Sequence, residues 1–399
     1  MSKRRYLVAL GGILLHLMIG SVYAWSVFTG PIAKQTGWAL SAVTIAFSIA
    51  IFFLGMSAAF MGRLVERFGP RLTGTVAALL YGSGLAVQIH SLPLLYIGYG
   101  VIGGLGLGAG YVTPVSTIIA WFPDKRGLAT GMAIMGFGFA AMLTGPVAQQ
   151  LIANLGVVAT MYVLGAVYML GSAQVIRKPH PHEVPAADLA KSVSLTGKAM
   201  KANEAVKTRS FRYLWLMFFI NITCGIGLVA VASPMAQQQT GMSATTAAVM
   251  VGVVGLFNGF GRLAWATLSD LIGRPLTYTL IFIVDVAMLA GILVLRSPLL
   301  FGIALCLIMS CYGAGFSVIP AYLGDVFGTK QLGAIHGYVL TAWAAAGVAG
   351  PTLLSFSEQY FHNYSVSLMI FIVLELIALG LSIRIRHQFA DAQVKDVTE

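Results

Sequence analysis

Long apolar blocks dominate the sequence and constrain the fold more than any other feature. A bilayer core of about 30 Å is crossed by a helix of roughly 20 apolar residues. Blocks of that length lie near residues 6–28, 42–61, 72–90, 94–119, 128–152, 157–176, 212–236, 243–268, 276–295, 299–322, 334–356 and 364–383. Each is long enough for one transmembrane span. The pattern therefore predicts an all-α membrane protein with twelve transmembrane helices.

Composition supports lipid as the solvent. Charged residues make up 9% of the 399 residues, whereas soluble domains carry about 25%. The net charge of +11 does not indicate a nucleic-acid partner, because the basic residues are spread over loops between apolar blocks. Cys224, Cys306 and Cys311 lie inside apolar blocks without paired spacing. The sequence therefore predicts no disulfide, no metal site and no cofactor.

The loops indicate the orientation and the domain organisation. Twelve spans place both termini, one long polar linker and four short loops on the same side. That side holds every Lys and Arg except Lys34 and Arg296, with Arg262 inside a span. The positive-inside rule makes it the cytoplasm. We expect a multi-pass protein of the cytoplasmic (inner) membrane with both termini cytoplasmic. The expected domains are a six-helix bundle at 1–176, a cytoplasmic linker at 177–211, and a six-helix bundle with a short tail at 212–399.

The two sets of spans are related by an internal repeat. The charged loop Gly62–Arg71 after span two corresponds to Ala266–Pro275 after span eight. Gly108–Tyr111 in span four corresponds to Gly313–Phe316 in span ten, about 205 positions later. A duplicated six-helix unit is typical of secondary transporters. By contrast, the Gly-rich run 103–110 lies inside an apolar span and follows no strand, so it does not indicate a nucleotide loop.

These features resemble the major facilitator superfamily. Three motifs, Tyr23–Trp25, Trp121–Gly127 and Asn258–Arg262, are similar to those of its oxalate/formate antiporter group, which belongs with the monocarboxylate transporters. The resemblance implies two pseudo-symmetric bundles that rock around a site near the middle of the membrane. It also implies that the acid of each charged loop caps a neighbouring helix and latches the cytoplasmic gate. The gate residues are then Gly62, Glu66, Arg67, Gly69, Arg71, Asp270, Gly273 and Arg274.

Arg262 is the sharpest candidate for substrate binding. An Arg in the middle of a membrane helix costs about 2.5–3.5 kcal/mol and needs a polar cavity or a partner. Its guanidinium can bind a carboxylate through two hydrogen bonds. Position alone equally allows a side chain that reaches the cytoplasmic face or pairs with Asp270, and the family resemblance favours substrate. Further expected substrate-binding residues are Asn258, Tyr23, Tyr111, Tyr312 and Phe316, with Thr113 as a weaker candidate.

Two departures from the family pattern bear on the substrate and on coupling. Trp343 stands where the oxalate carrier has a lysine in span eleven. A single intramembrane cation matches a single carboxylate, so the sequence favours a monocarboxylate such as lactate, pyruvate or formate. Asn258 stands where animal monocarboxylate carriers have an aspartate, which removes their usual proton site. Asp285 and His16 are the alternative proton-coupling candidates, although the favoured interpretation of Asp285 and Glu375 is that of paired or interfacial packing acids, and His16 is at least as well explained as a satisfied core histidine.

The sequence therefore predicts a monomeric carrier of small monocarboxylates that works by alternating access, with proton symport favoured over anion exchange. An oxalate/formate-type antiporter is the alternative, and a non-transporting membrane sensor is the alternative from another class. An enzyme is not expected, because no cluster of acids, histidines or serine motifs occurs.

Overall fold

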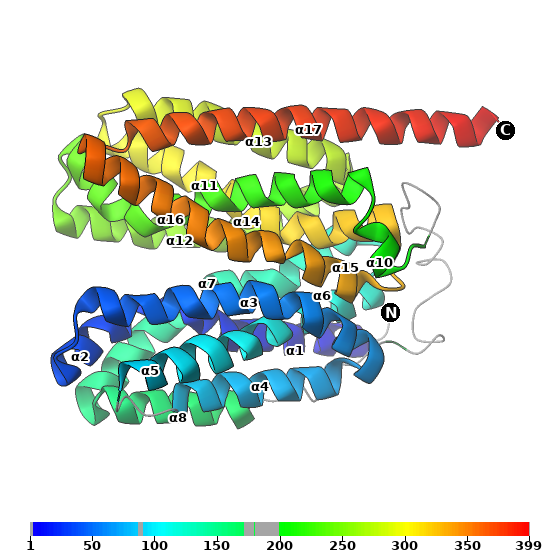
Figure 1. The fold of residues 1–399 in the computed structure, drawn as a ribbon. Coiled ribbons are helices and arrows are strands. Elements are labelled where there is room, and N and C mark those ends of the chain that lie inside the picture. Colours follow the sequence, from blue (N-terminus) through cyan, green and yellow to red (C-terminus); the bar gives the residue numbers. More distant parts are fainter. Residues whose placement is uncertain (1–2, 87–90, 171–178, 180–198, 399) are drawn as a thin grey trace. The chain divides into compact units, whose positions relative to one another are not determined.

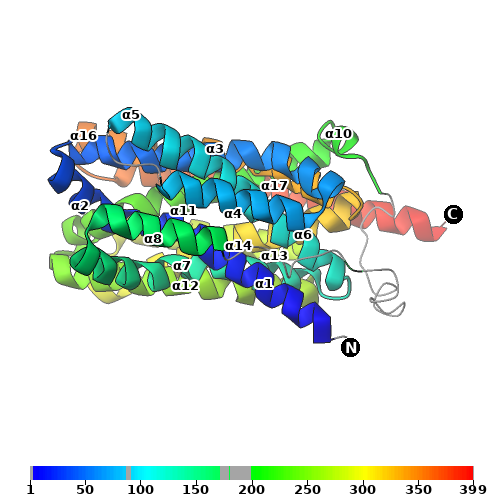
Figure 2. The same cartoon turned by 90° about the horizontal axis from the view of Figure 1, so that it is seen from below.

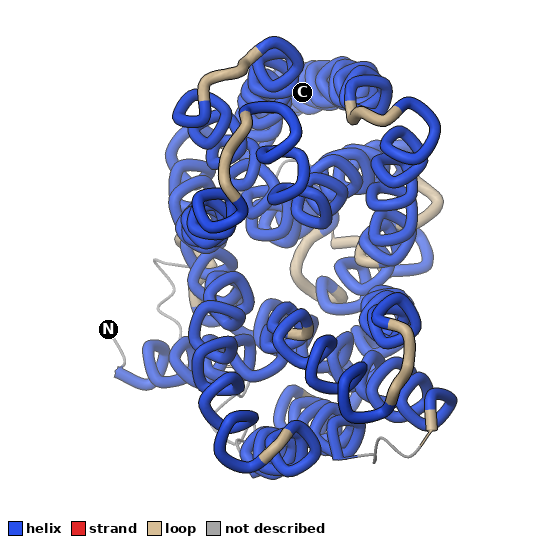
Figure 3. Tube along the Cα trace, turned by 90° about the vertical axis from the view of Figure 1, so that its left-hand side faces the viewer, coloured by secondary structure: helices blue, strands red, loops and turns tan. Residues whose placement is uncertain are grey.

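A computed structural model describes residues 3–86, 91–170, 179 and 199–398. The described residues contain helices and no strand (Figure 3). The chain divides into two compact units. The first comprises Met1–Asp124, Met132–Lys191 and Gln331–Ala344, and the second comprises Lys125–Gly131, Ser192–Lys330 and Ala345–Glu399. The expected linker lies largely outside the described residues, and the predicted division into domains stays a prediction.

The first unit contains the helices of the first six predicted spans, labelled in Figure 1. They are α1 (Lys3–Gly20), η1 (Ser21–Ala24), α2 (Ser26–Thr36), α3 (Leu40–Phe68), α4 (Pro70–Ala86), α5 (Leu92–Leu95), η2 (Tyr96–Gly103), α6 (Gly104–Trp121), α7 (Arg126–Leu155) and α8 (Val157–Leu170). The first turns of α7, up to Gly131, belong to the second unit. The unit also includes α15 (Leu332–Val339), which packs on α3. Figure 2 shows α4 beside α8.

Two of these spans are not uniform α-helices. Span one passes through the 3₁₀ turn η1 between α1 and α2, and span four begins with the π-helical stretch η2 before α6. The glycines that follow in α6 let neighbouring helices approach closely. A Cβ on Gly106 would lie 2.5 Å from the backbone nitrogen of Tyr81, and one on Gly108 would overlap Ser57. The Gly-rich run is therefore a helix-packing surface.

The second unit contains α10 (Ala202–Ala205), α11 (Arg209–Thr240), α12 (Ala244–Ile272), α13 (Arg274–Val294), α14 (Pro298–Phe327) and α17 (Ser365–Thr398). Helix α16 (Thr341–Phe361) belongs to this unit from Ala345 onward. Helix α12 packs along α14, and α13 runs beside α17 (Figure 1).

Ten of the described helices are long and apolar enough to cross a membrane. The two remaining predicted spans correspond to the shorter α4 and α8, each of which ends beside residues outside the description. Large apolar side chains are exposed on the spans, for example Phe60 (65%) and Val249 (65%). This is the pattern expected where lipid replaces water.

The repeated charged loops share the same backbone. Gly69 and Gly273 end α3 and α12 with φ values of +83° and +85°, a region that favours glycine. Pro70 then begins α4, and Pro275 lies in the first turn of α13, where its missing N–H costs nothing. The duplication visible in the sequence is therefore also a duplication of helix ends.

Candidate functional site

Arg262 is fully buried within α12 (0% exposed). Its Nε donates to Oδ1 of Asn258, one turn earlier, at 3.3 Å. Its guanidinium carbon lies 5.0 Å from the ring centre of Phe316 on α14, a cation–π distance. Full burial argues against a side chain that extends to the cytoplasmic face. The sequence-predicted residues Arg262, Asn258 and Phe316 are thus brought together in the second unit.

Two glycines bring α12 and α14 close enough for this contact. A Cβ on Gly261 would lie 2.6 Å from the Cα of Ser310. A Cβ on Gly313 would lie 3.0 Å from the Cγ of Arg262 and would overlap the backbone of Asn258. The small residues at 261 and 313 therefore set the helix separation at the level of the guanidinium.

Aromatic rings from α11 and α14 support Phe316. Tyr312 meets it edge-on, with ring centres 5.3 Å apart, and so does Phe218 of α11, also at 5.3 Å. Edge-to-face pairs of this kind fix ring orientation. Tyr312 is 2% exposed and packs against Gly225, where a Cβ would overlap its ring. Tyr312 thus helps to place Phe316 under the guanidinium.

The predicted residues of the first unit form a separate aromatic cluster around Phe137. Its ring centre lies 5.0 Å from that of Tyr23, 5.4 Å from that of Tyr111 and 5.8 Å from that of Trp343. Tyr111 and Trp343 also meet each other at 5.3 Å. Trp343 is fully buried, so the position of the family's lysine is filled by an apolar ring within this cluster.

His16 lies beside this cluster with both ring nitrogens close to backbone oxygens. Its Nδ1 is 2.5 Å from the carbonyl oxygen of Ala133, and its Nε2 is 3.1 Å from that of Tyr111. A neutral imidazole can donate from only one nitrogen, and a charged one from both. The two contacts hold His16 between α6 and α7. Thr113 likewise bonds within its own helix, to the carbonyl oxygen of Ala109 at 2.7 Å.

His336 is a residue that the sequence analysis missed. It lies on α15, is 1% exposed, and its ring centre is 6.1 Å from that of Tyr111. Within the described part of the chain, neither ring nitrogen has a hydrogen-bond partner. The signal was present, since residue 336 falls inside the predicted span 334–356.

The acids of the two charged loops each bind the first turn of another helix. Asp270 accepts hydrogen bonds from the backbone N–H groups of Gly127 (2.9 Å) and Leu128 (2.8 Å) at the start of α7. Glu66 accepts one from Gly333 (3.1 Å) at the start of α15. A carboxylate is favourable at this position because the first N–H groups of a helix lack partners and its dipole is positive there.

Asp270 and Arg274 also belong to a buried ion network with Arg126 and Asp325, two residues that the gate prediction did not include. Arg274 contacts Asp270 at 2.6 Å and Asp325 at 3.2 Å, and Arg126 contacts Asp325 at 2.7 Å. Two cations and two anions balance, which offsets the cost of their burial. Asp325 had a sequence signal, because it is the single acid between Asp285 and Glu358. Asp270 is thus engaged by Arg274 and by the start of α7.

The other predicted gate residues differ in burial. Gly62 is buried, and a Cβ there would overlap the backbone of Gly333, so α3 and α15 touch at this point. Arg67 and Arg71 are exposed. The guanidinium of Arg67 lies over the ring of Phe68 at 5.1 Å. These two arginines are therefore surface charges in the structure.

Asp285 lies on α13 and is 2% exposed. Its Oδ2 accepts a hydrogen bond from Nδ2 of Asn221 on α11 at 3.2 Å. Asp285 is thus bound to α11.

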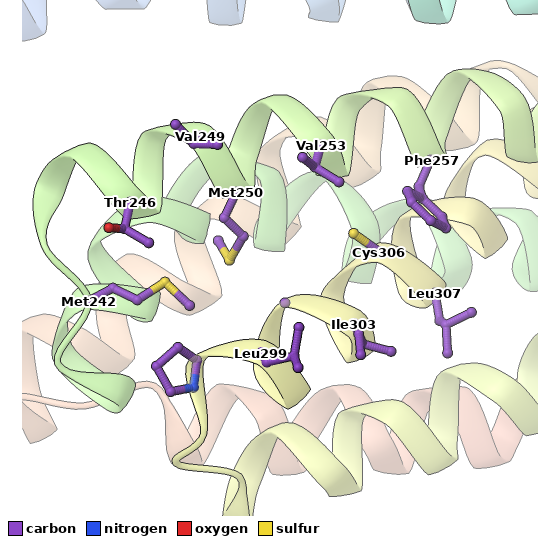
Figure 4. A pocket seen from close by; sticks show the side chains of 12 residues that line it. Met242, Thr246, Val249, Met250, Val253, Phe257, Leu299, Ile303, Cys306 and Leu307 are labelled. Atoms are coloured by element: carbon purple, nitrogen blue, oxygen red, sulfur yellow. The ribbon is translucent and has the colours of Figure 1, made fainter.

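A cavity of about 400 Å³ between α12 and α14 does not contain these polar groups (Figure 4). Its lining is almost wholly apolar and includes Met250, Val253, Phe257 and Ile303, with Thr246 near one end. A carboxylate would find no charged group there. The cavity is therefore suited to apolar chains and is not the candidate anion site.

Comparison with known proteins identifies the class of protein. The sequence profile described as "Major Facilitator Superfamily" matches residues 8–351. The chain therefore belongs to the major facilitator superfamily and is a multi-pass membrane transporter, not an enzyme. This confirms the predicted family, its all-α fold and the absence of an enzymatic class.

Individual relatives agree with this assignment. The oxalate:formate antiporter of Oxalobacter formigenes is 28% identical, over 88% of this chain and 84% of its own. Monocarboxylate transporter 11 of Mus musculus is 26% identical, over 85% of this chain and 76% of its own. Among solved structures, the fucose:proton symporter of E. coli superposes with a TM-score of 0.73 at 14% identity, covering 95% of this chain and 98% of that one. The first two confirm the predicted transporter group, and the third confirms the fold.

Proposed function

We propose that this protein carries small monocarboxylates of the lactate, pyruvate or formate type by alternating access, with Arg262 binding the carboxylate. The observation that supports this is a fully buried guanidinium in an apolar helix, held by Asn258 and Phe316. A charged side chain inside a membrane helix is costly in free energy, and such residues usually belong to a binding site or a transport pathway. Tyr312, Tyr23 and Tyr111 are the further substrate-binding candidates of this proposal.

The choice of a monocarboxylate follows from charge balance. The family's second cation is replaced by Trp343, which is buried between the rings of Tyr111 and Phe137. A dicarboxylate bound to Arg262 would bring a second negative charge without a matching cation. Burying that charge unpaired would cost several kcal/mol.

The mode of coupling has two candidates. Binding of an anion neutralises Arg262 and lowers the free energy of the closed, dry intermediate. If only the loaded carrier can pass through that intermediate, the protein exchanges one anion for another. A proton-binding group elsewhere converts exchange into proton symport, which we favour. Exchange is the second candidate because a relative of this chain is an oxalate:formate antiporter. In both cases the proposed location is the cytoplasmic membrane, and the charged loops with Glu66 and Asp270 act as cytoplasmic latches.

Uptake into proteoliposomes tests the substrate. Radiolabelled lactate, pyruvate, formate and oxalate are compared, with and without a pH gradient and with and without anion inside. A monocarboxylate is expected to be taken up fastest. Oxalate uptake faster than that of every monocarboxylate would contradict the proposal, and acceleration by internal anion alone would favour exchange.

Arg262→Gln tests the site. Uptake and anion binding are expected to be lost, because glutamine keeps the polarity but removes the charge and the paired donors. Arg262→Lys should retain part of the binding. Arg296→Gln is the matched control, since Arg296 bonds to nearby backbone at the surface, and it should behave as wild type. Normal binding by Arg262→Gln would exclude this site.

A further inference from the structure

We propose that Asp285 and Glu375 form one proton-binding site within the second unit and that at neutral pH the two carboxyls carry at most one negative charge between them. Asp285 lies on α13 and Glu375 on α17, helices that run beside each other (Figure 1). Asp285 is 2% exposed and Glu375 is 0% exposed. The two carboxyls interact electrostatically.

The contacts of the pair leave oxygens unsatisfied. Asn221 donates to Oδ2 of Asp285 at 3.2 Å, and the weakly donating thiols of Cys311 and Cys224 lie next to Asp285 and Glu375. Within the described residues, Oδ1 of Asp285 and both carboxyl oxygens of Glu375 receive no hydrogen bond from an N–H or O–H group. The Oδ1 of Asn221, itself 1% exposed, also lacks one. A buried carboxylate with open oxygens is far more costly than a protonated carboxyl.

The surrounding groups do not supply a compensating charge. The titratable side chains that face the pair are the thiols of Cys224 on α11 and Cys311 on α14. Neither carboxyl forms an ion pair with Lys or Arg in the part of the chain that is described. Helix α12, which also packs on α13, carries two ionisable residues. Arg262 contacts Asn258 and Phe316, and Asp270 contacts Arg274 and the start of α7.

Two negative charges in a dry site repel each other and lose hydration, so at least one carboxyl keeps its proton. The second can gain or lose a proton when water reaches the pair. Uptake takes one proton from water onto a carboxylate oxygen, and release returns it, with no other bond changed.

The pair is connected to α14, the helix whose Phe316 lies under Arg262 of α12. Nδ2 of Asn221 also lies 3.5 Å from the carbonyl oxygen of Cys311 on α14. The next residue, Tyr312, packs on Phe316, and Phe316 lies under Arg262. A change in the charge of Asp285 alters the hydrogen bond of Asn221 and thereby biases α14. This connection gives the proton site a route to the anion site.

Infrared difference spectroscopy of the full-length protein in lipid tests proton occupancy, independently of the proposed function. At neutral pH the wild type should show a carboxylic-acid carbonyl band, sensitive to D₂O, that is lost in the double variant Asp285→Asn/Glu375→Gln. Glu358→Gln is the matched control, because Glu358 is exposed on the same unit, and it should keep the band. An identical carboxyl region in wild type and double variant would show that both acids are ionised and would overturn the site.

Transport measurements test the use of the proton and rest on the proposed carriage of monocarboxylates. Formate uptake by the wild type should be accelerated by an inward proton gradient. The double variant should show equal uptake with and without the gradient, while exchange of internal for external formate persists. Gradient-driven uptake that survives in the double variant, or a wild type indifferent to the gradient, would overturn the coupling role. If the wild type did not bind formate at all, that result would instead contradict the proposed function.

Discussion

At the scale of single residues, Arg262 shows how a charge is held in an apolar helix. Oδ1 of Asn258 accepts a hydrogen bond from its Nε, and the ring of Phe316 covers one face of the guanidinium. Neither neighbour neutralises it, since an amide and an aromatic ring carry no formal charge. A carboxylate at position 258 would differ from the amide in adding a negative charge beside the guanidinium, where it would compete with a bound anion.

Asn258→Asp tests this directly. The new carboxylate would lie within hydrogen-bonding distance of Nε and compete with the substrate for the guanidinium. A charged hydrogen bond is worth about 1.5–3 kcal/mol, so formate should bind about 10- to 100-fold more weakly at neutral pH. Arg262 favours the ionised form of the new acid, and lowering the pH protonates it and should restore binding.

The measurement is equilibrium binding of labelled formate over a pH series. Asn258→Ala is the control, because it removes the hydrogen bond without adding a charge, and its pH profile should follow that of wild type. A profile of Asn258→Asp that is flat with pH, at wild-type affinity, would show that residue 258 does not influence the anion site.

At the scale of elements, helix contacts place the side chains. Helices α12 and α14 meet through glycines at 261 and 313, so their separation is set by missing side chains. The Gly313–Phe316 repeat is visible in the sequence, but the helix that it faces is not. That pairing joins residues that are far apart in the chain, and a span's own hydropathy contains no information about its neighbour.

Gly313→Ala should therefore disturb the site. The added Cβ would overlap the backbone of Asn258 and crowd Arg262. Overpacking of this kind costs about 1–3 kcal/mol, and the two helices must move apart. We expect a lower melting temperature in detergent and slower formate uptake.

Gly302→Ala on the same helix is the matched control. There the nearest atom to a Cβ is Cγ of Met250 at 3.6 Å, an ordinary contact. Uptake and melting temperature should match wild type. Equal behaviour of the two alanine variants would mean that the α12–α14 approach at Gly313 does not position Arg262.

At the scale of the whole molecule, the charge distribution predicts the orientation in the membrane. Lys34 and Arg296 are the only basic residues on the side opposite the termini in the predicted arrangement. A green fluorescent protein fused to the C-terminus should be fluorescent, and alkaline phosphatase fused there should be inactive. Phosphatase fused after Ser297, in the loop between α13 and α14, is the control and should be active. The reverse pattern would contradict the cytoplasmic assignment of the termini.

The family followed from the internal repeat and from short motifs, whereas hydropathy was enough to predict the spans and the fold class, because partition into lipid depends on about 20 consecutive residues of a single segment. Hydropathy also singled out Arg262, since a charge in such a block is costly wherever the helix packs. The partners of each polar group followed from packing. Asn221 meets Asp285 across 64 positions, and Arg126 meets Asp325 across 199. Only the folded helices bring such residues within hydrogen-bonding distance, because side-chain contacts between spans depend on rotation and depth that no single segment specifies.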